Sequence, residues 1–567
     1  MWAVRIIMTN ADIYTCDSRM PRAGTVMFEG EKITGVFAVN DQSWKKAAGE
    51  DAEIRDMNGR MIVPGFADSH THPALISQST WHIKLPWTED PDELLGFIRD
   101  YAHNHPRSEM PFLLFEFYPA FMFGAEGPAK ELLDSAVSDR PCMCLDHGFH
   151  MQWVNSKMLK LMGITEKTKD PVPGIEEFVR DENGVPTGLI KEFAFLPYLR
   201  KMFVKMLWIP PIRLTPQRMA PFFRFNEEHG VLALGDGLTE GSSQLSAMRK
   251  LEKQGRLNLY YEGAVGFSGY AELGKKIKKL RRLQKKYSSR HININTMKLF
   301  LDGTNESGNS ALLEPHANDP CGSNFGEMKM EAEELKRCFL LCNREAVDLH
   351  IHMVGDRAFR TACDAVESAQ KEAEIKGEKW VCQPVFAHCE LIHPDDMMRP
   401  AKLGITINTT PAWFGGIFGE EAMRFMTAEK WRSMYRFGEI IESDALVAFS
   451  SDEVSFSELY TSDPFYGMQT GITRRDINYP IDAGRYPGSV RPEAAAKLDR
   501  ETLLRGYTLN SAKQLHMDDR MGSIERGKLA NMCVLSGNCL TVPEEEMYRI
   551  SCDIVVFEGK VIKDSRA

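Results

Sequence analysis

Residues 62–72 read Ile62-Val63-Pro64-Gly65-Phe66-Ala67-Asp68-Ser69-His70-Thr71-His72. The apolar start is typical of a buried strand, and Asp68, His70 and His72 follow at intervals of two residues. Side chains two apart in a strand share one face, so both imidazoles can bind one metal ion. A His-x-His pair alone is more often a strand end with exposed histidines, so its interpretation depends on the rest of the chain.

The composition is that of an ordinary globular protein, with 43% hydrophobic and 26% charged residues among 567. A net charge of -10 argues against binding to nucleic acid or to an anionic membrane surface. No apolar run has the length of a membrane span, and the first residues lack the layout of a signal peptide. We therefore expect a cytoplasmic protein whose twelve cysteines are reduced thiols.

Short alternating strands occur at both ends of the chain, and residues 1–61 and 521–567 are predicted to form one composite β-sandwich. Residues 62–520 alternate buried strands with helical patterns, which is typical of a (β/α)8 barrel. The first strand is predicted over residues 62–72. The other seven are predicted at 231–237, 257–265, 292–302, 347–353, 384–390, 404–408 and 446–452.

Too much chain separates His72 from the second predicted strand for one βα unit, so we expect an inserted subdomain at about 76–225. Its many aromatic residues form either its own core or an apolar roof over a substrate. A second unusual segment is the basic run 275–286, where leucines recur at helical spacing. It predicts a helix with one packed face and a solvated basic face, and nucleic-acid binding is the less favoured alternative.

Titratable side chains lie at the ends of several predicted barrel strands, where barrels of this kind carry their chemistry. Burying such a group without a partner costs several kcal/mol. One such residue is usually a satisfied polar group in a core, but five strands that each deliver one indicate a metal centre. These residues are His70, His72, Lys298, His350, His352, His388 and Asp452.

Together with 64–72, several further motifs carry a resemblance that extends over nearly the whole chain. They lie at 153–156, 298–303, 352–358, 388–392, 451–452, 507–510 and 522–530. The chain resembles the amidohydrolase superfamily of metal-dependent hydrolases. It is most similar to the YtcJ-like branch, which includes N-substituted formamide deformylase.

The resemblance implies a role for each matching residue. His70 and His72 would bind a first metal ion, and His352 and His388 a second one. Lys298 would be carboxylated and would bridge the two ions, which are one or two divalent metals, with zinc as the expected element. Asp452 would contact the first ion and transfer a proton, and His150 would face the substrate.

Two departures from the pattern of the family bear on the substrate. Gly148-Phe149-His150 stands where Asp-Gly-His is common, which leaves the substrate-facing residue open between neighbours. Glu453 follows Asp452 where a small residue or Trp is usual. It either favours a cationic substrate or is a solvated loop acid, and Trp153 is the second predicted substrate contact.

We therefore expect an enzyme that hydrolyses a carbon–nitrogen bond, other than a peptide bond, in a small and partly apolar amide by attack of a metal-activated hydroxide. The same site would also suit deamination, lactone or ester hydrolysis, or decarboxylation. A regulator that keeps the barrel without catalysis is the less favoured reading. The expected partner is a small-molecule substrate, with neither nucleic acid nor membrane, and a homodimer is the default assembly.

Overall fold

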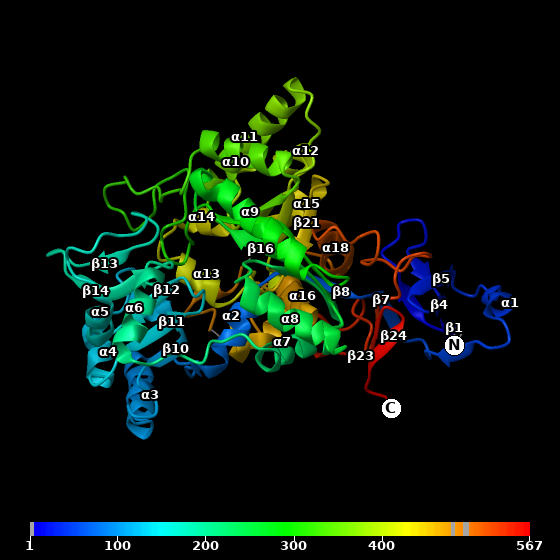
Figure 1. Ribbon diagram of the computed structural model, residues 1–567, viewed down its shortest axis with the longest axis horizontal. Helices are drawn as coiled ribbons and strands as arrows, with labels where there is room; N and C mark the ends of the chain where they lie inside the picture. Colours follow the sequence, from blue (N-terminus) through cyan, green and yellow to red (C-terminus); the bar gives the residue numbers. More distant parts are fainter. Residues whose placement is uncertain (1–4, 478–481, 492–497, 567) are drawn as a thin grey trace.

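The structure is a computed structural model that describes residues 5–477, 482–491 and 498–566. Eight parallel strands form its central sheet, and the predicted (β/α)8 barrel is confirmed (Figure 1). In order around the sheet they are β8 (Phe66–Thr71), β15 (Val231–Asp236), β16 (Tyr260–Gly266), β17 (Ile292–Phe300), β18 (Asp348–Met353), β19 (Pro384–His388), β20 (Thr406–Thr409) and β21 (Leu446–Phe449). Seven of them lie within a few residues of their predicted positions.

Hydrogen bonds between β8 and the end of β21 close the ring of strands. The Ser69 hydroxyl donates to the Phe449 carbonyl over 2.8 Å, and the Asp452 amide donates to the His70 carbonyl over 2.8 Å. The first and last strands are therefore linked at the same end of the barrel, which is the end where the predicted metal ligands lie.

Helices cover the outside of the barrel and bury apolar stripes against it. The main ones are α2 (Pro73–Gln78), α7 (Pro216–Glu228), α8 (Ser242–Lys253), α9 (Tyr270–Tyr287), α10 (Ala332–Arg344), α11 (Asp356–Ile375) and α16 (Pro464–Thr473). Helix α9 buries Leu273, Ile277, Leu280 and Leu283 and leaves its lysines outside, as predicted for the basic run. Among the described residues, none of the helices combines the length and the apolar character that crossing a membrane requires.

The chain changes sheets at Gly65, so the single strand predicted over 62–72 is wrong. Residues before it form β7 (Met61–Pro64), which pairs with β22 (Met532–Leu535) in another sheet. The Gly65 amide bonds the carbonyl of Asn531 over 3.0 Å, and the next amide, of Phe66, bonds the carbonyl of Gly230 over 2.9 Å. A side chain at Gly65 would meet Leu232 at 2.6 Å, so only glycine fits this turn without rearrangement.

Segments from both ends of the chain form two further sheets. One has the order β5-β4-β1-β6, and the other β24-β23-β22-β7-β2-β3. Their bounds are β1 (Arg5–Thr9), β2 (Asp12–Tyr14), β3 (Arg22–Ala23), β4 (Thr25–Glu29), β5 (Lys32–Phe37), β6 (Glu53–Asp56), β23 (Cys552–Phe557) and β24 (Lys560–Asp564). The two sheets share one apolar core, to which Phe28 and Val556 belong. The limits of the domains themselves stay a prediction.

The chain between α2 and α7 forms its own sheet, which lies on the side of the barrel away from β1 and β24 (Figure 1). The order is β13-β14-β12-β11-β10-β9. The bounds are β9 (Ile83–Lys84), β10 (Leu113–Tyr118), β11 (Cys142–Asp146), β12 (Met151–Val154), β13 (Phe178–Arg180) and β14 (Pro186–Lys191), with helices α3 (Pro91–Asn104), α4 (Lys130–Ala136), α5 (Ser156–Met162) and α6 (Leu196–Met206).

Candidate metal centre

Three side chains from distant parts of the sequence meet at the C-terminal end of the barrel. His70 lies in β8, His388 ends β19, and Asp452 follows β21. One ligand atom from each lies within 4.8 Å of the other two, a spacing at which they could hold a single ion. The distance from His70 Nε2 to Asp452 Oδ1 is 3.6 Å, and that from His388 Nδ1 to Asp452 Oδ2 is 3.7 Å.

The other predicted ligands border this cluster. His72 follows β8 and begins α2, and its Nε2 lies 3.2 Å from Asp452 Oδ1. Lys298 of β17 places Nζ 2.9 Å from His70 Nε2. The ring of His352, in β18, lies 4.5 Å from that of His388. The structure thus gathers all six predicted ligands at one end of the barrel.

Backbone strain helps to aim two of these side chains. His388 has a φ of 72° and Asp452 a φ of 46°, and Cys389, the neighbour of His388, has a φ of 48°. Positive φ values are uncommon for residues with side chains and cost of order 1–3 kcal/mol. The bend at His388 lies at the end of β19 and that at Asp452 lies just beyond the end of β21, where each strand gives way to a loop.

The electrostatics of the cluster suit a cation. Burial, followed by repulsion from Lys298 or from other histidines, holds the pKa of His70, His352 and His388 well below the usual value. Neutral imidazoles are the form that binds metals. Within the described residues, His72 Nδ1, His352 Nε2, His388 Nδ1 and Asp452 Oδ1 are buried without a hydrogen-bond partner. Unpaired buried polar atoms are costly, and a bound metal ion fits this donor set.

Asp68 fastens the metal-binding strand to the loop that carries Asp452. The Ser451 hydroxyl donates to Asp68 Oδ2 over 2.5 Å, and the Ser451 amide donates to Oδ1 over 3.0 Å. Gly237, directly beyond β15, leaves space for the imidazoles of His70 and His72. A methyl group there would lie 2.4 Å from His70 Nε2 and 2.7 Å from His72 Cε1.

Half-buried aromatic rings line the approach to the cluster, and the sequence reasoning did not single them out. Trp413 stacks on His388 with centroids 5.4 Å apart, and Phe418 lies 5.2 Å from Trp413. Next to His352, the ring centroid of Phe300 lies 5.2 Å from that of the imidazole. The ring centroid of Phe193 lies 6.0 Å from that of Phe300. The only available signal for Trp413 was its position just after a predicted barrel strand, where loops surround the site.

His150 reaches the cluster from the insertion. Its ring stacks at 5.7 Å on that of His352, and Nδ1 lies 2.6 Å from Glu192 Oε2. Burial opposes the charged form, but the adjacent Glu192 carboxylate outweighs it and raises the pKa of His150 to about 9. The structure therefore places an imidazole that is paired with a carboxylate beside the candidate metal centre. No pattern in the sequence around Glu192 indicated that this residue would pair with His150.

The structure buries both predicted substrate contacts, and their roles in substrate binding stay predictions. Trp153 is fully buried in the core of the insertion, against Tyr118 and Phe123, and its indole N–H donates to the Ala129 carbonyl. Glu453 is 6% exposed, so it is not a solvated acid either. Its two carboxylate oxygens accept hydrogen bonds from the amides of 454 and 455 and from the Thr461 hydroxyl. In this structure Glu453 therefore stabilises the loop to which it belongs.

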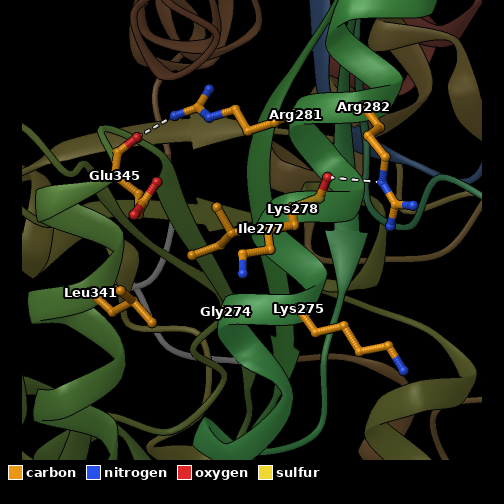
Figure 2. Close-up of a pocket in the computed structure, with 8 residues that line it drawn as sticks. All are labelled: Gly274, Lys275, Ile277, Lys278, Arg281, Arg282, Leu341 and Glu345. Atoms are coloured by element: carbon orange, nitrogen blue, oxygen red, sulfur yellow. Dashed lines mark hydrogen bonds between the residues drawn. The ribbon is translucent and has the colours of Figure 1, made fainter.

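A cavity of about 590 Å³ lies outside the barrel, between α9 and α10 (Figure 2). Its wall consists of Gly274, Lys275, Ile277, Lys278, Arg281, Arg282, Leu341 and Glu345. The Arg281 guanidinium donates to the Glu345 carbonyl, and Arg282 Nε donates to the Lys278 carbonyl over 3.2 Å. This groove shares no residue with the metal cluster, and its basic side chains belong to the solvated face of α9.

Comparisons with known proteins identify the family of the chain. The profile of the amidohydrolase family matches residues 53–563. The exoenzymes regulatory protein AepA of Pectobacterium carotovorum subsp. carotovorum is 26% identical, over 72% of this chain and 85% of that protein. The N-substituted formamide deformylase of Arthrobacter pascens is 25% identical, over 94% of this chain and 93% of that protein, which confirms the predicted resemblance.

The fold has a solved counterpart. An uncharacterized metal-dependent hydrolase from Pyrococcus horikoshii OT3 superimposes with a TM-score of 0.66 at 22% identity. The match covers 95% of this chain and 99% of the other. At that identity, the likeness establishes the architecture of the chain.

Proposed function

Because the chain belongs to the amidohydrolase family, we propose that it hydrolyses a carbon–nitrogen bond, other than a peptide bond, in a small and partly apolar amide. The observation that carries this proposal is the convergence of His70, His388 and Asp452 on one point at the barrel mouth. The family supports hydrolysis in general. The bond type and the substrate are part of the proposal.

The residues of the chain suit the steps of amide hydrolysis. His70, His72, His352, His388 and Lys298 would hold one or two divalent ions, with zinc as our candidate and with Lys298 as a carbamate. When bound, such an ion supplies Lewis acidity, which makes water a stronger acid and polarises a carbonyl oxygen. Asp452 accepts a proton from the attacking water and returns it to the leaving nitrogen, so water and amide yield a carboxylic acid and an amine.

His150 and the aromatic rings account for the remaining requirements. A charged His150 imidazole can donate to the carbonyl oxygen as negative charge develops on it. Trp413, Phe300 and Phe418 provide an apolar wall that holds the body of the substrate and excludes water. The name of one relative, N-substituted formamide deformylase, suggests formamides as the first substrates to test.

The test is hydrolysis by the purified, zinc-loaded protein of N-alkyl formamides, an N-alkyl acetamide, a lactone and a dipeptide. We expect release of formate and amine from formamides that carry an apolar N-substituent, with loss of this activity in Asp452→Asn. Faster hydrolysis of the lactone or the dipeptide would reject the proposed bond type. Absence of turnover on the whole panel with metal bound would reject the proposal as a whole.

A further inference from the structure

Three buried polar side chains with unused atoms lie where the insertion meets the barrel mouth. Tyr118 ends β10 and Asp146 ends β11, and the two residues are partners across these parallel strands. Glu421 comes from α13 (Ile417–Ala422) of the barrel, and its Oε1 accepts the amide of Ala120 over 2.9 Å. All three side chains are 0% exposed.

Each of the three keeps one atom without a hydrogen-bond partner among the described residues: Asp146 Oδ2, Glu421 Oε2 and the Tyr118 hydroxyl. The three residues are neighbours in the fold, because Tyr118 pairs with Asp146 across the sheet and Glu421 binds the amide of Ala120, two residues beyond Tyr118. Natural proteins rarely leave buried polar atoms unpaired, because each such atom loses its hydrogen bonds to water without replacement. Three of them in one place indicate that a ligand completes the set.

The nearby arginine does not fill this role. The Arg424 guanidinium donates its hydrogen bonds to main-chain carbonyls, namely those of Ala120, Gly124, Glu306 and Glu421. The charges of His150 and Arg424 lower the pKa of Asp146, and that of Arg424 lowers the pKa of Glu421, but among the described residues no basic side chain forms a direct ion pair with either carboxylate. Burial raises the pKa of Asp146 to about 6 and that of Glu421 to about 8, an energetic cost that a bound cation would remove.

The trio borders the proposed substrate wall. A Cβ atom on Gly148 would lie 3.5 Å from Asp146 Oδ2, 3.8 Å from Phe418 Cε1 and 3.8 Å from His150 Cδ2. Phe418 and Glu421 are three residues apart on α13 and therefore share a face of the helix. The acids thus lie next to the ring that follows Trp413, at the end of the wall away from His388.

We propose that Asp146, Glu421 and the Tyr118 hydroxyl form a subsite for an ammonium group, and that the natural substrate is an amide with a positively charged amine on its apolar chain. That the substrate is an amide rests on the proposed function. That it carries an amine rests on the unpaired oxygen atoms of Asp146 and Glu421. An ammonium group offers three N–H donors, which matches three unused oxygen atoms. A cationic substrate was one of the two alternatives that the sequence left open for Glu453, and the present proposal assigns the cation to Asp146 and Glu421 instead.

The kinetic test compares two formamides of equal length, N-formyl-1,5-diaminopentane and N-formylhexylamine, on the zinc-loaded protein. We expect the charged compound to have a kcat/KM about tenfold to a hundredfold higher, as charged hydrogen bonds suggest. In Glu421→Gln and in Asp146→Asn this ratio should fall at least tenfold. In the control Glu131→Gln, an exposed acid of the insertion, the ratio should stay as in the parent.

A binding test separates this subsite from the hydrolytic activity. Calorimetry with pentylammonium chloride and with 1-pentanol should show tighter binding of the cation, lost in Glu421→Gln, together with release of a proton into the buffer. Equal binding of the two compounds would overturn the subsite even if formamides are hydrolysed. Selective binding without any hydrolysis would keep the subsite and reject the proposed reaction. Thermal unfolding of each variant shows that it remains folded.

Discussion

The ring of Trp413 stacks on that of His388, with planes inclined by 18°. One residue is a candidate metal ligand and the other belongs to the apolar wall, so substrate binding and metal binding share a contact. Stacked aromatic pairs contribute about 0.5–1.5 kcal/mol beyond their buried area. Replacement of Trp413 should therefore weaken both substrate binding and metal binding.

Trp413→Ala should lower kcat/KM for an apolar formamide about tenfold and raise the zinc concentration needed for half-maximal activity. Trp413→Phe should keep most of the kcat/KM and most of the zinc affinity, because an aromatic ring still covers His388. Steady-state kinetics under zinc titration measures the two effects. A change in KM alone, with unaltered zinc affinity, would show that the stacking does not support the ligand.

Gly237→Ala should lower the metal content of the protein without unfolding the barrel, because the added methyl group would displace the imidazoles of His70 and His72. The matched control is Gly274→Ala in α9, where an added Cβ meets nothing within 4 Å. It should raise stability by up to about 1 kcal/mol. Elemental analysis and thermal melts give both results, and full metal content in Gly237→Ala would contradict the packing seen around His70.

Asp452→Asn should bind metal but lose turnover by about 10²–10⁴-fold, because an amide cannot accept the proton of water. Asp444→Asn is its control, since Asp444 is exposed and Asn tolerates its φ of 65°. Single-turnover kinetics on metal-loaded protein measures the chemical step. Normal turnover in Asp452→Asn would exclude the proton-transfer role.

Lys298→Ala should lower the metal content from the expected one to two equivalents and reduce activity, with partial rescue by short carboxylic acids that replace a carbamate. Lys298 is 1% exposed and lies 2.9 Å from His70, so little else can occupy its place. Lys376→Ala, on the surface at the end of α11, controls for the loss of a lysine. Unchanged metal loading would remove Lys298 from the ligand set.

Acid should weaken the junction between the terminal sheets and the barrel. Glu558 accepts from Tyr260 at 2.7 Å and from Arg290 at 2.8 Å. Although burial opposes ionisation, its hydrogen bonds to His291, Tyr260 and Arg290 prevail and lower the pKa of Glu558 to about 2. A carboxyl with a lowered pKa stabilises the fold above its unfolded value of about 4.3, and the contribution disappears as pH falls toward 2.

The corresponding variant is Glu558→Gln. It should be less stable than the parent at pH 6, and the difference in unfolding free energy should shrink as the pH falls from about 4 to 2. Glu545→Gln, at an exposed site nearby, should match the parent throughout. A difference that does not vary with pH would mean that the Glu558 charge plays no part in the junction.

The barrel could be predicted because its parallel strands are short apolar runs, several of which carry a residue of metal-binding type near the end, as 347–353 carries His352. Local pattern and chemistry agree there. The single strand predicted over 62–72 joins two strands, because β7 and β8 follow each other with only Gly65 between them. Pairing with β22, more than 450 residues away, shows that β7 belongs to another sheet than β8.

The ligand-type residues could be found in the sequence, but their surroundings could not. Glu453 looked available because its partners are amides of its own loop, which no sequence pattern specifies. Trp153 looked like a wall residue, because its type suits a binding site and a core equally well. Glu192 and Trp413 act through contacts with distant segments, and these contacts exist only after the loops fold.

The passage of one continuous segment from β7 into β8 has a consequence for how the protein is made. On the ribosome, β7 emerges early, but its partner β22 emerges only after more than 460 further residues have been synthesised. The edge of β7 that β22 covers therefore stays unpaired until translation is nearly complete. Because β7 continues directly into the strand that carries His70, ribosome-released fragments without the last strands should expose an unpaired strand edge next to the metal centre.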